Sequence, residues 1–431
     1  MLTLIKNGYL IDPASDREGK YDLLIEDDRI KLVDEHISEN GLTEEEITII
    51  DASGKYIMPG FIDLHVHLRE PGYEYKETIK TGSMAAAAGG FTTICPMPNT
   101  NPPIDSPEGI KLIIDKAKED SLVNILPVAC ITLGQEGKIL ADIRAMAEAG
   151  AIAISEDGKS VMDSSLYETA MREAAQAGIL VLAHCEDKAL VAKGVINSGK
   201  KADDLGLMGI SNAVEDVITA RDIILSKETG ARLHLCHVST ADSATMIKLA
   251  KSQGLSVTGE VTPHHFTLSD EDIPGDDGNY KMNPPLRNLK DVDALKKAIK
   301  DNVIDAIATD HAPHSKEEKF TSFTKASFGI VGLETAFALT MMELVKPGVI
   351  TLRQMVEKLS VNPARILNIP KGCIGEGWIA DLVIADLESV YSIDSSQFYS
   401  KAKHSPFDGR KVIGRITHTF VSGKLKYHKE R

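Results

Sequence analysis

The chain has 431 residues, of which 43% are hydrophobic, and its 48 basic and 63 acidic side chains give a formal net charge of −15. The length allows one large domain and a smaller one, and the composition is typical of a globular protein. The acidic balance argues against nucleic acid as a partner, because phosphate binding needs a basic surface. It leaves room for a small anionic substrate held by one or two arginines.

The sequence has no feature of a membrane or secreted protein. No apolar run approaches the roughly 20 residues that a membrane-spanning helix needs. The N-terminal stretch MLTLIKNGYLIDPAS lacks a basic region followed by a long apolar core, so no signal peptide is expected. Five cysteines without CxxC spacing argue against disulfides and against a zinc ribbon. The expected location is the reducing cytoplasm, without membrane contact.

In chain order, β-rich pieces come first, and from residue 55 short apolar runs alternate with helical stretches. The runs read FIDLHVH, FTTICPMPN, NILPVACIT, AIAISED, ILVLAHCED, RLHLCHVS, LSVTGEVTPHH and IDAIATDHA. Several of the Ala-, Lys- and Glu-rich segments between them end in glycine, as helices commonly do. Eight strand–helix units in a row predict a (β/α)8 barrel of the TIM type, in preference to a doubly wound open sheet.

The two ends of the chain are rich in β-like pieces, and neither end is a complete domain by itself. TLIKNGYLI and YDLLIED lie near the start, and ADLVIADL and KVIGRITHTFVSGKLKY lie near the end. We therefore expect residues 1–54 and 365–431 to pair into one small β-sandwich domain. Residues 55–364 would form the barrel domain beside it.

Two histidines end the first predicted barrel strand. The stretch GFIDLHVHLREPG, from residue 60, begins as an apolar run and then carries His65, His67 and Arg69. Side chains at i and i+2 of a strand point the same way, so both imidazoles leave one face together. The pair alone leaves open both a metal site and an ordinary core strand.

Other polar side chains close later strands of the predicted barrel. They are Asp157 in AISEDG, His184 in VLAHCED, His237 in LCHVST and Asp310 in IATDHAPH. Active sites of such barrels lie at the C-terminal ends of the strands, so folding would gather these residues with His65 and His67. Four imidazoles and two carboxylates suit zinc or a similar ion. Six ligands exceed one open tetrahedral site, and a two-metal centre is predicted.

Alternation along the strands selects among neighbouring candidates. In AIAISED the small residues share a face with Asp157, whereas the bulky isoleucines share the other face with Glu156. This favours Asp157 as the inward carboxylate, able to bridge two metals. In LHLCHVS, His234 and His237 lie on opposite faces, so only one can point inward, and we choose His237 at the strand end. His234, His264 and His265 are expected to be ordinary core or surface residues.

The ordered motifs resemble a known family. PGFIDLHVHLREPG, TTICPMPNT, AHCED, CHVST, EVTPHH, YKMNPPLR and ATDHAPH together are similar to the cyclic amidohydrolases. Within that superfamily they resemble the bacterial class I dihydroorotases, which share one architecture with hydantoinases. The resemblance covers nearly the whole chain, and HVHLREPG with PMPNT points to dihydroorotase in particular.

The resemblance implies a reaction and a set of site residues. The reaction is the reversible interconversion of N-carbamoyl-L-aspartate and L-dihydroorotate in de novo pyrimidine (UMP) biosynthesis. One Zn²⁺ would take His65 and His67, and the other His184 and His237, with Asp157 between them and Asp310 as a further ligand. Substrate recognition is assigned to His67, Arg69, Asn99, Asn283, His314, Phe328 and Gly329.

Chemistry agrees with part of this assignment. A guanidinium two residues beyond a metal ligand can grip a carboxylate in two places. Asn99 and Asn283 could each offer an amide to the ring, although both lie beside prolines where turn chemistry is an equal explanation. Segment 315–330 is predicted to be a substrate loop that brings the backbone of Phe328 and Gly329 to the substrate, or else a solvated loop.

The implied mechanism uses Asp310 twice. Two bound metals would supply a hydroxide that attacks the ring carbonyl, and one of them would polarise that carbonyl. Asp310 takes the hydroxide proton as general base and then gives it to the leaving ring nitrogen as general acid.

One position departs from many relatives of the superfamily, which bridge their metals with a carboxylated lysine on strand four. Here Lys159 lies past a glycine, beyond the predicted strand end, so an aspartate bridge is expected. The bacterial dihydroorotases tend to carry two adjacent aspartates at this point, whereas here the first is Glu156. The choice among Asp157, Glu156 and a modified Lys159 stays open.

Two other functions stay open as alternatives. One is a dihydropyrimidinase or allantoinase, whose substrates carry no carboxylate for Arg69. The other is a non-catalytic dihydroorotase-like subunit of an aspartate transcarbamoylase complex, which would be expected to have lost metal ligands. A homodimer is expected, and an active enzyme could also associate with aspartate transcarbamoylase.

Overall fold

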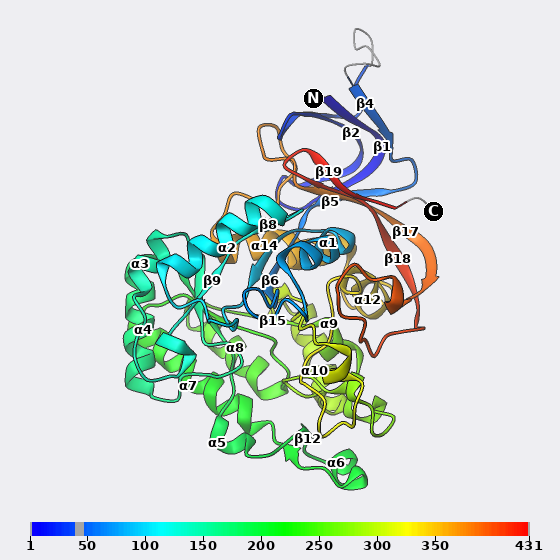
Figure 1. Ribbon diagram of the computed structural model, residues 1–431. Coiled ribbons are helices and arrows are strands. Elements are labelled where there is room, and N and C mark those ends of the chain that lie inside the picture. The colour runs from blue at the N-terminus through cyan, green and yellow to red at the C-terminus, as the bar shows by residue number, and fades with distance from the viewer. Residues whose placement is uncertain (1, 39–46, 430–431) are drawn as a thin grey trace.

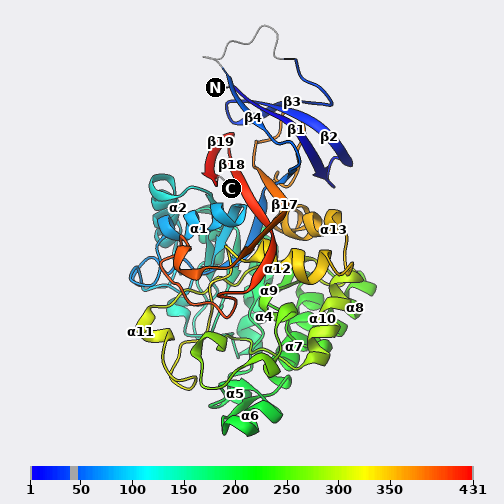
Figure 2. The ribbon, with the colours of Figure 1, turned by 90° about the vertical axis from the view of Figure 1, so that its right-hand side faces the viewer.

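The computed structural model describes residues 2–38 and 47–429. Residues 1, 39–46 and 430–431, which fall within the predicted β-domain, lie outside the described residues. Figure 1 shows two parts, a barrel wrapped by helices and a sheet above it that contains strands from both ends of the chain. The view turned by 90° places the same sheet above the barrel and helices α5 (Lys188–Val191) and α6 (Lys200–Leu205) at the opposite end (Figure 2).

All eight predicted barrel runs contain strands, and all the neighbouring pairs among them are parallel. The strands are β6 (Phe61–Val66), β7 (Phe91–Pro96), β8 (Asn124–Ile125), β9 (Val128–Cys130), β10 (Ala153–Ser155), β11 (Leu180–Ala183), β14 (Leu233–Leu235), β15 (Val257–Val261) and β16 (Ala306–Ile307). The third run is split into β8, which pairs with β7, and β9, which pairs with β10. Pro127 lies at the break, where its missing N–H interrupts the ladder.

The first and last strands close the barrel beyond β16. Val66 forms a parallel bridge with His311, and the Val66 neighbour His67 donates its backbone N–H to the His311 carbonyl at 2.8 Å. The Asp63 carboxylate accepts the Thr309 hydroxyl at 2.6 Å and the Thr309 backbone N–H at 3.1 Å. The predicted barrel is therefore confirmed.

Helices cover the barrel in the order that the alternation predicts. The helices that follow the successive barrel strands are α1 (Ile79–Gly89), α2 (Pro107–Asp120), α3 (Ile143–Glu148), α4 (Ser164–Ala177), α7 (Ala213–Thr229), α8 (Ala241–Ser252) and α10 (Leu289–Lys300). Gly90, Gly178 and Gly230 end α1, α4 and α7 in the left-handed conformation, which glycine adopts without steric cost. No helix of the described ranges is long and apolar enough to cross a membrane.

Shorter elements fill the connections. They are α9 (Pro263–Thr267), α11 (Lys316–Lys319), α12 (Ala336–Thr340), α13 (Leu352–Val356) and α14 (Asn362–Leu367), the strands β12 (Ile196–Asn197) and β13 (Gly209–Ile210), the π-helical turns η4 (Met341–Val345) and η5 (Glu357–Val361), and the 3₁₀ turns η1 (Leu133–Gln135), η2 (Asp270–Asp272), η3 (Gly278–Tyr280) and η6 (Ser395–Gln397). Helix α14 packs against the barrel, where Ile366 and Leu367 join Ile62, Leu64 and Leu182 in an apolar interior cluster.

The two chain ends form one mixed sheet, as predicted. Within the described residues its order is β19-β18-β17-β5-β1-β2-β3, with β4 also paired to β1. The strands are β1 (Leu2–Asp12), β2 (Arg17–Glu26), β3 (Arg29–Asp34), β4 (Ile47–Asp51), β5 (Tyr56–Pro59), β17 (Leu382–Ser392), β18 (Lys411–Val421) and β19 (Lys424–His428). Strand β5, just before the barrel, joins β1 to β17 and so connects the two chain ends.

Candidate active site

The structure brings the six candidate ligands together at the C-terminal ends of β6, β10, β11, β14 and β16. Asp157 lies at the centre of the cluster. Its Oδ1 is 3.3 Å from His65 Nε2, 3.5 Å from His184 Nδ1 and 3.9 Å from His237 Nε2. Its Oδ2 is 3.6 Å from His67 Nε2, which in turn is 3.1 Å from Asp310 Oδ1.

All six side chains are buried, and several of their polar atoms have no hydrogen-bond partner. These atoms include Nε2 of His65 and Oδ1 of Asp157, which lie 3.3 Å apart within the cluster. Unsatisfied buried polar atoms are costly, and their convergence is typical of a site that binds an ion. Two groups of compatible donors are His65 with His67 and Asp310, and His65 with Asp157 and His237. Imidazole and carboxylate donors of this kind suit zinc.

Three of the expected site residues have an unusual backbone conformation. The φ angles of Arg69, His237 and Asp310 are 62°, 35° and 46°. Non-glycine residues rarely adopt this left-handed region, which costs about 1–3 kcal/mol and clusters at functional sites. These residues turn their side chains at points where regular strands end.

Both carboxylates of the cluster are ionised. Burial raises the pKa of Asp157, but the surrounding imidazoles of His65, His184 and His237 hold it well below its usual range. Burial acts in the same way on Asp310, and there His65 and His67 keep the pKa lowered. Asp310 is therefore unprotonated at neutral pH.

Strand four orients its residues as alternation predicts. Glu156 points away from the cluster, where its carboxylate accepts the backbone N–H groups of Ile131 and Thr132, both at 3.1 Å. Lys159 is exposed in the turn that follows. Of the three carboxylate or lysine candidates for the bridging position, Asp157 alone lies in the cluster.

Strand six does not follow alternation. His237 lies in the cluster, with Nε2 2.9 Å from His184 Nδ1. His234 also reaches the interior, where its Nε2 lies 3.0 Å from Glu260 Oε2. The prediction that only one of the two histidines could point inward is therefore wrong, because the positive φ of His237 ends the regular alternation.

Glu260 is a functional candidate that the sequence reasoning missed. This fully buried carboxylate of β15 lies 3.3 Å from His65 Nδ1, on the side of the ring opposite the cluster. Burial opposes ionisation, yet His234 and His65 lower the pKa of Glu260 to about 2. Such a carboxylate fixes the tautomer and orientation of a ligating histidine. A glutamate inside the apolar run LSVTGEV was the signal available in the sequence.

Arg69 and His314 lie together beside the cluster. Arg69 donates from Nε to the Pro313 carbonyl at 3.1 Å, and its Nη2 is 3.4 Å from His314 Nε2. His314 Nε2 is 2.8 Å from the Phe328 carbonyl, and its Nδ1 is 3.4 Å from Lys76 Nζ. Burial and the charges of Arg69 and Lys76 lower the pKa of His314, so the ring is neutral, with its proton on Nε2 toward Phe328.

The two asparagines contact candidate ligands or their neighbours. Asn99 accepts with Oδ1 from His67 Nδ1 at 2.9 Å and donates from Nδ2 to Asp157 Oδ2 at 3.1 Å. Asn283 donates to Glu186, whose carboxylate is 3.7 Å from His184 Nε2. Asn99 therefore helps to orient His67 and Asp157, and Asn283 helps to orient Glu186 beside His184.

The segment 315–330 is anchored to the protein along its length. Lys319, which is fully buried, donates from Nζ to the carbonyls of Lys281 and Ser327 at 2.7 and 3.0 Å. Gly329 donates its backbone N–H to the Lys281 carbonyl at 3.0 Å. The backbone groups expected to face substrate at Phe328 and Gly329 are thus bonded to His314 and Lys281 in this structure.

Comparison with known proteins agrees with this geometry. A family model described as Dihydro-orotase-like matches residues 54–243. Dihydroorotase from Caldanaerobacter subterraneus subsp. tengcongensis is 45% identical over 431 residues, covering 100% of this chain and 98% of that protein. Dihydroorotase from Syntrophus aciditrophicus is 45% identical over 430 residues and is covered fully. The chain belongs to the dihydroorotase family.

Membership of the dihydroorotase family makes the chain an enzyme, a hydrolase of the amidohydrolase kind. The fold is also that of a solved L-hydantoinase (dihydropyrimidinase) from Arthrobacter aurescens, with a TM-score of 0.85 and 27% identity. That match covers 98% of this chain and 95% of the hydantoinase. The expected architecture and family are therefore confirmed together.

Proposed function

We propose that the protein catalyses the reversible cyclisation of N-carbamoyl-L-aspartate to L-dihydroorotate in pyrimidine biosynthesis. The observation that carries this proposal is the buried cluster of four imidazoles and two carboxylates, with Arg69 beside it, in a member of the dihydroorotase family. The cluster supplies metal donors, and the arginine supplies a partner for a ring carboxylate.

The proposal includes two Zn²⁺ ions. His65 and His67 would hold one, His184 and His237 the other, with Asp157 shared between them and Asp310 as a further ligand. The orphaned Nε2 of His65 and Oδ1 of Asp157, which face each other in the cluster, support this assignment. When bound, the ions would supply an activated water and polarise the ring carbonyl.

Asp310 would move the proton. Its carboxylate is unprotonated, as a general base must be before it takes a proton, and it lies 3.1 Å from the His67 ring of the cluster. The same group would then deliver that proton to the ring nitrogen that leaves. In the cyclisation direction it would take the proton from the carbamoyl nitrogen instead.

Arg69 would bind the substrate carboxylate, with His67, His314, Asn99, Asn283 and the backbone of Phe328 and Gly329 around the ring. The guanidinium is already oriented by its bond to the Pro313 carbonyl, which reduces the entropy lost on binding. On binding the substrate ring, Asn99 would break or rearrange one of its two hydrogen bonds, to His67 or to Asp157.

The alternative of a hydantoin- or dihydropyrimidine-hydrolysing enzyme has weaker support. Solved proteins with those names share the fold at 27% identity, whereas dihydroorotases share 45%. Arg69 would lack a carboxylate partner with such substrates. The non-catalytic alternative is disfavoured because all six candidate ligands are present and buried together.

The remaining expectations belong to the same proposal. Residues 1–54 with 365–431, and 55–364, would be the two domains, with β5 as the strand that links them. The five cysteines are all free, which supports a reducing cytoplasmic location. A homodimer and association with aspartate transcarbamoylase are proposed from family resemblance, and light scattering of the purified protein with and without the transcarbamoylase would test both.

The first experiment is hydrolysis of L-dihydroorotate by purified, zinc-loaded protein, before and after chelation. We expect turnover that chelation abolishes and added Zn²⁺ restores, because the activated water depends on the ions. Hydantoin and dihydrouracil serve as comparison substrates in the same assay. Turnover of these two without turnover of dihydroorotate would replace the proposed function with the hydantoinase alternative.

Arg69→Met should weaken substrate binding and leave the metal content unchanged. Methionine keeps most of the side-chain volume and removes the charged hydrogen bonds, each of which contributes about 1.5–3 kcal/mol. KM for dihydroorotate should therefore rise roughly 10- to 150-fold. Steady-state kinetics with metal analysis tests this, and Arg144→Met, at an exposed position, is the matched control. Loss of metal in Arg69→Met would instead assign Arg69 a structural role.

A further inference from the structure

Two buried side chains beside the site have no part in the proposed mechanism. His311 directly follows Asp310 and is 1% exposed, and Glu77 directly precedes Thr78, the N-cap of α1, and is 0% exposed. His311 Nε2 lies 3.4 Å from Glu77 Oε2, although the two residues are 234 positions apart in the chain. The contact joins the start of the first barrel helix to the end of the last barrel strand.

The backbone of His311 connects two candidate site residues. Its carbonyl accepts the His67 backbone N–H at 2.8 Å, and His311 forms parallel bridges with Val66 on one side and Ile330 on the other. Asp310, which precedes it, has a φ of 46°, a conformation that persists only where the surroundings enforce it. The position of His311 therefore helps to set where Asp310 and His67 lie.

The His311 ring has a defined tautomer. The Gly332 backbone N–H donates to His311 Nδ1 at 3.2 Å, so Nδ1 is the acceptor. The proton of a neutral ring is then on Nε2, the atom that faces Glu77. Each ring nitrogen thus has one partner, and the two partners fix the plane of the ring.

Glu77 is held as a carboxylate by several donors. Its oxygens accept the hydroxyls of Ser400 and Thr81 and the backbone N–H groups of Thr78 at 3.2 Å and Lys401 at 3.3 Å. Burial raises its pKa, but His311 and the two hydroxyls outweigh burial and leave the pKa lowered. The carboxylate therefore stays charged and immobile behind the site.

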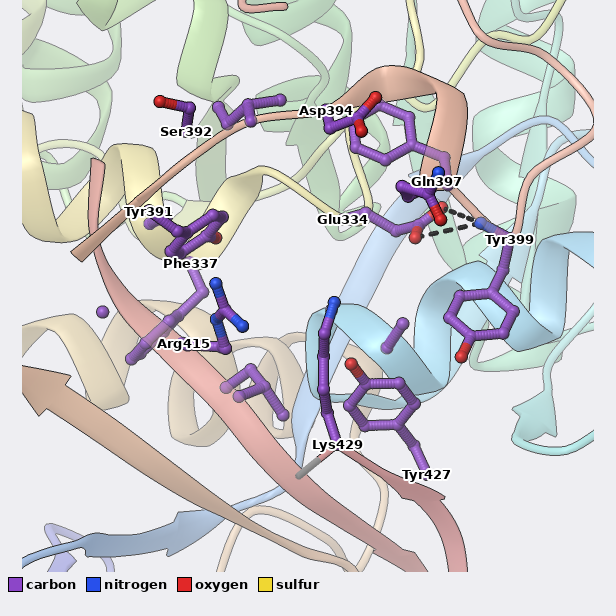
Figure 3. Close-up of a pocket in the computed structure, with 17 residues that line it drawn as sticks. Glu334, Phe337, Tyr391, Ser392, Asp394, Gln397, Tyr399, Arg415, Tyr427 and Lys429 are labelled. Carbon is purple, nitrogen blue, oxygen red and sulfur yellow. Dashed lines mark hydrogen bonds between the residues drawn. The ribbon is translucent and has the colours of Figure 1, made fainter. Parts of the chain in front are cut away.

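The Ser400 segment is anchored in turn. Glu334 accepts the Tyr399 backbone N–H at 2.8 Å and the Ser400 N–H at 3.2 Å. Figure 3 shows Glu334 directed at Tyr399 in the wall of a surface pocket. Glu334 lies four residues after the bridge residue Ile330, so the segment that supports Glu77 is itself tied to the chain leaving the last barrel strand.

We propose that Glu77 and His311 are a positioning pair that keeps the Asp310 carboxylate and the His67 ring in the geometry needed for turnover. Neither side chain touches the substrate. The pair acts through the His311 backbone, and its kinetic consequence rests on the proposed function.

Two variants of similar shape test the two hydrogen bonds of the His311 ring separately, the one with Glu77 and the one with Gly332. The longer side chain of His311→Gln can place an N–H donor near the Nε2 position, toward Glu77. The shorter side chain of His311→Asn can place an acceptor near the Nδ1 position, toward Gly332, but it has no donor that reaches Glu77. Mutation of residues that support a metal site from outside its ligands typically costs about 10- to 100-fold in metal affinity or activity. We expect kcat of His311→Asn to fall by about that factor with KM within about twofold, and His311→Gln to stay within about threefold of the parent protein.

The absorption spectrum of the cobalt(II)-loaded protein provides a readout that needs no turnover, because its ligand-field bands depend on ligand geometry. His311→Asn should change the bands, and His311→Gln should not. His418→Asn, at a buried histidine of β18 in the other sheet, is the matched control and should keep parental values in both assays.

Parental kcat and spectrum in His311→Asn would overturn the proposal, and so would an equal loss in both His311 variants. Failure of the parent protein to hydrolyse dihydroorotate would contradict the proposed function, and the cobalt spectra alone would then decide the positioning pair.

Discussion

Asp310→Asn is expected to lower kcat for dihydroorotate hydrolysis by about 10²- to 10⁴-fold, the usual contribution of a positioned general acid–base group. Asparagine has nearly the same shape, but it cannot take a proton at neutral pH. The amide can still meet His67 Nε2, which is 3.1 Å from Asp310 Oδ1, so the ring should keep its place. Steady-state kinetics in both reaction directions would measure the loss.

Metal content must be measured on the same samples, because Asp310 is also a proposed ligand. We expect at least one metal ion per chain to remain, since His184, His237 and Asp157 are unchanged. Asp301→Asn, at an exposed aspartate that pairs with Lys297, is the matched control and should keep the parental kcat. A kcat for Asp310→Asn within about threefold of the parent, at full metal content, would remove Asp310 from the proton-transfer step.

The direction in which a side chain points can be predicted from the sequence where the backbone is a regular strand. Asp157 could be chosen over Glu156 because β10 is an ordinary extended strand, in which alternation decides the facing. The same rule failed at β14, since His237 has a φ of 35° that no pattern of residue types reveals. Arg69 and Asp310 share this left-handed backbone, so the direction of a side chain at a strand end is the feature that alternation predicts least well.

The residues that support the cluster could not be predicted from the sequence for a different reason. Glu260 and Glu77 are recognisable only through their partners, His65 and His311, which lie far away in the chain. Sequence patterns describe neighbours within a strand or helix, whereas these contacts arise from the closure of the barrel. Buried carboxylates in apolar stretches are the trace that such contacts leave in a sequence, because an ionised group inside the core needs a partner.

His65→Ala should remove metal from the site and nearly all activity. His65 is fully buried, and its ring lies between Asp157 at 3.3 Å on one side and Glu260 at 3.3 Å on the other. It also belongs to each of the candidate metal groups found among the described residues. Its removal takes one donor from the ions and leaves Asp157 and Glu260 without the imidazole between them.

The loss should extend to stability. Breaking a buried charged pair by removing one partner costs about 3–5 kcal/mol, because the remaining charge is left uncompensated. Urea unfolding of the metal-free proteins would measure this term apart from the contribution of the ions. His418→Ala, which empties a buried histidine position of β18, controls for the loss of volume. Among the six candidate ligands, only His65 contacts Asp157, Asp310 and Glu260 together. Parental zinc content and parental turnover of dihydroorotate in His65→Ala would therefore contradict the metal assignment.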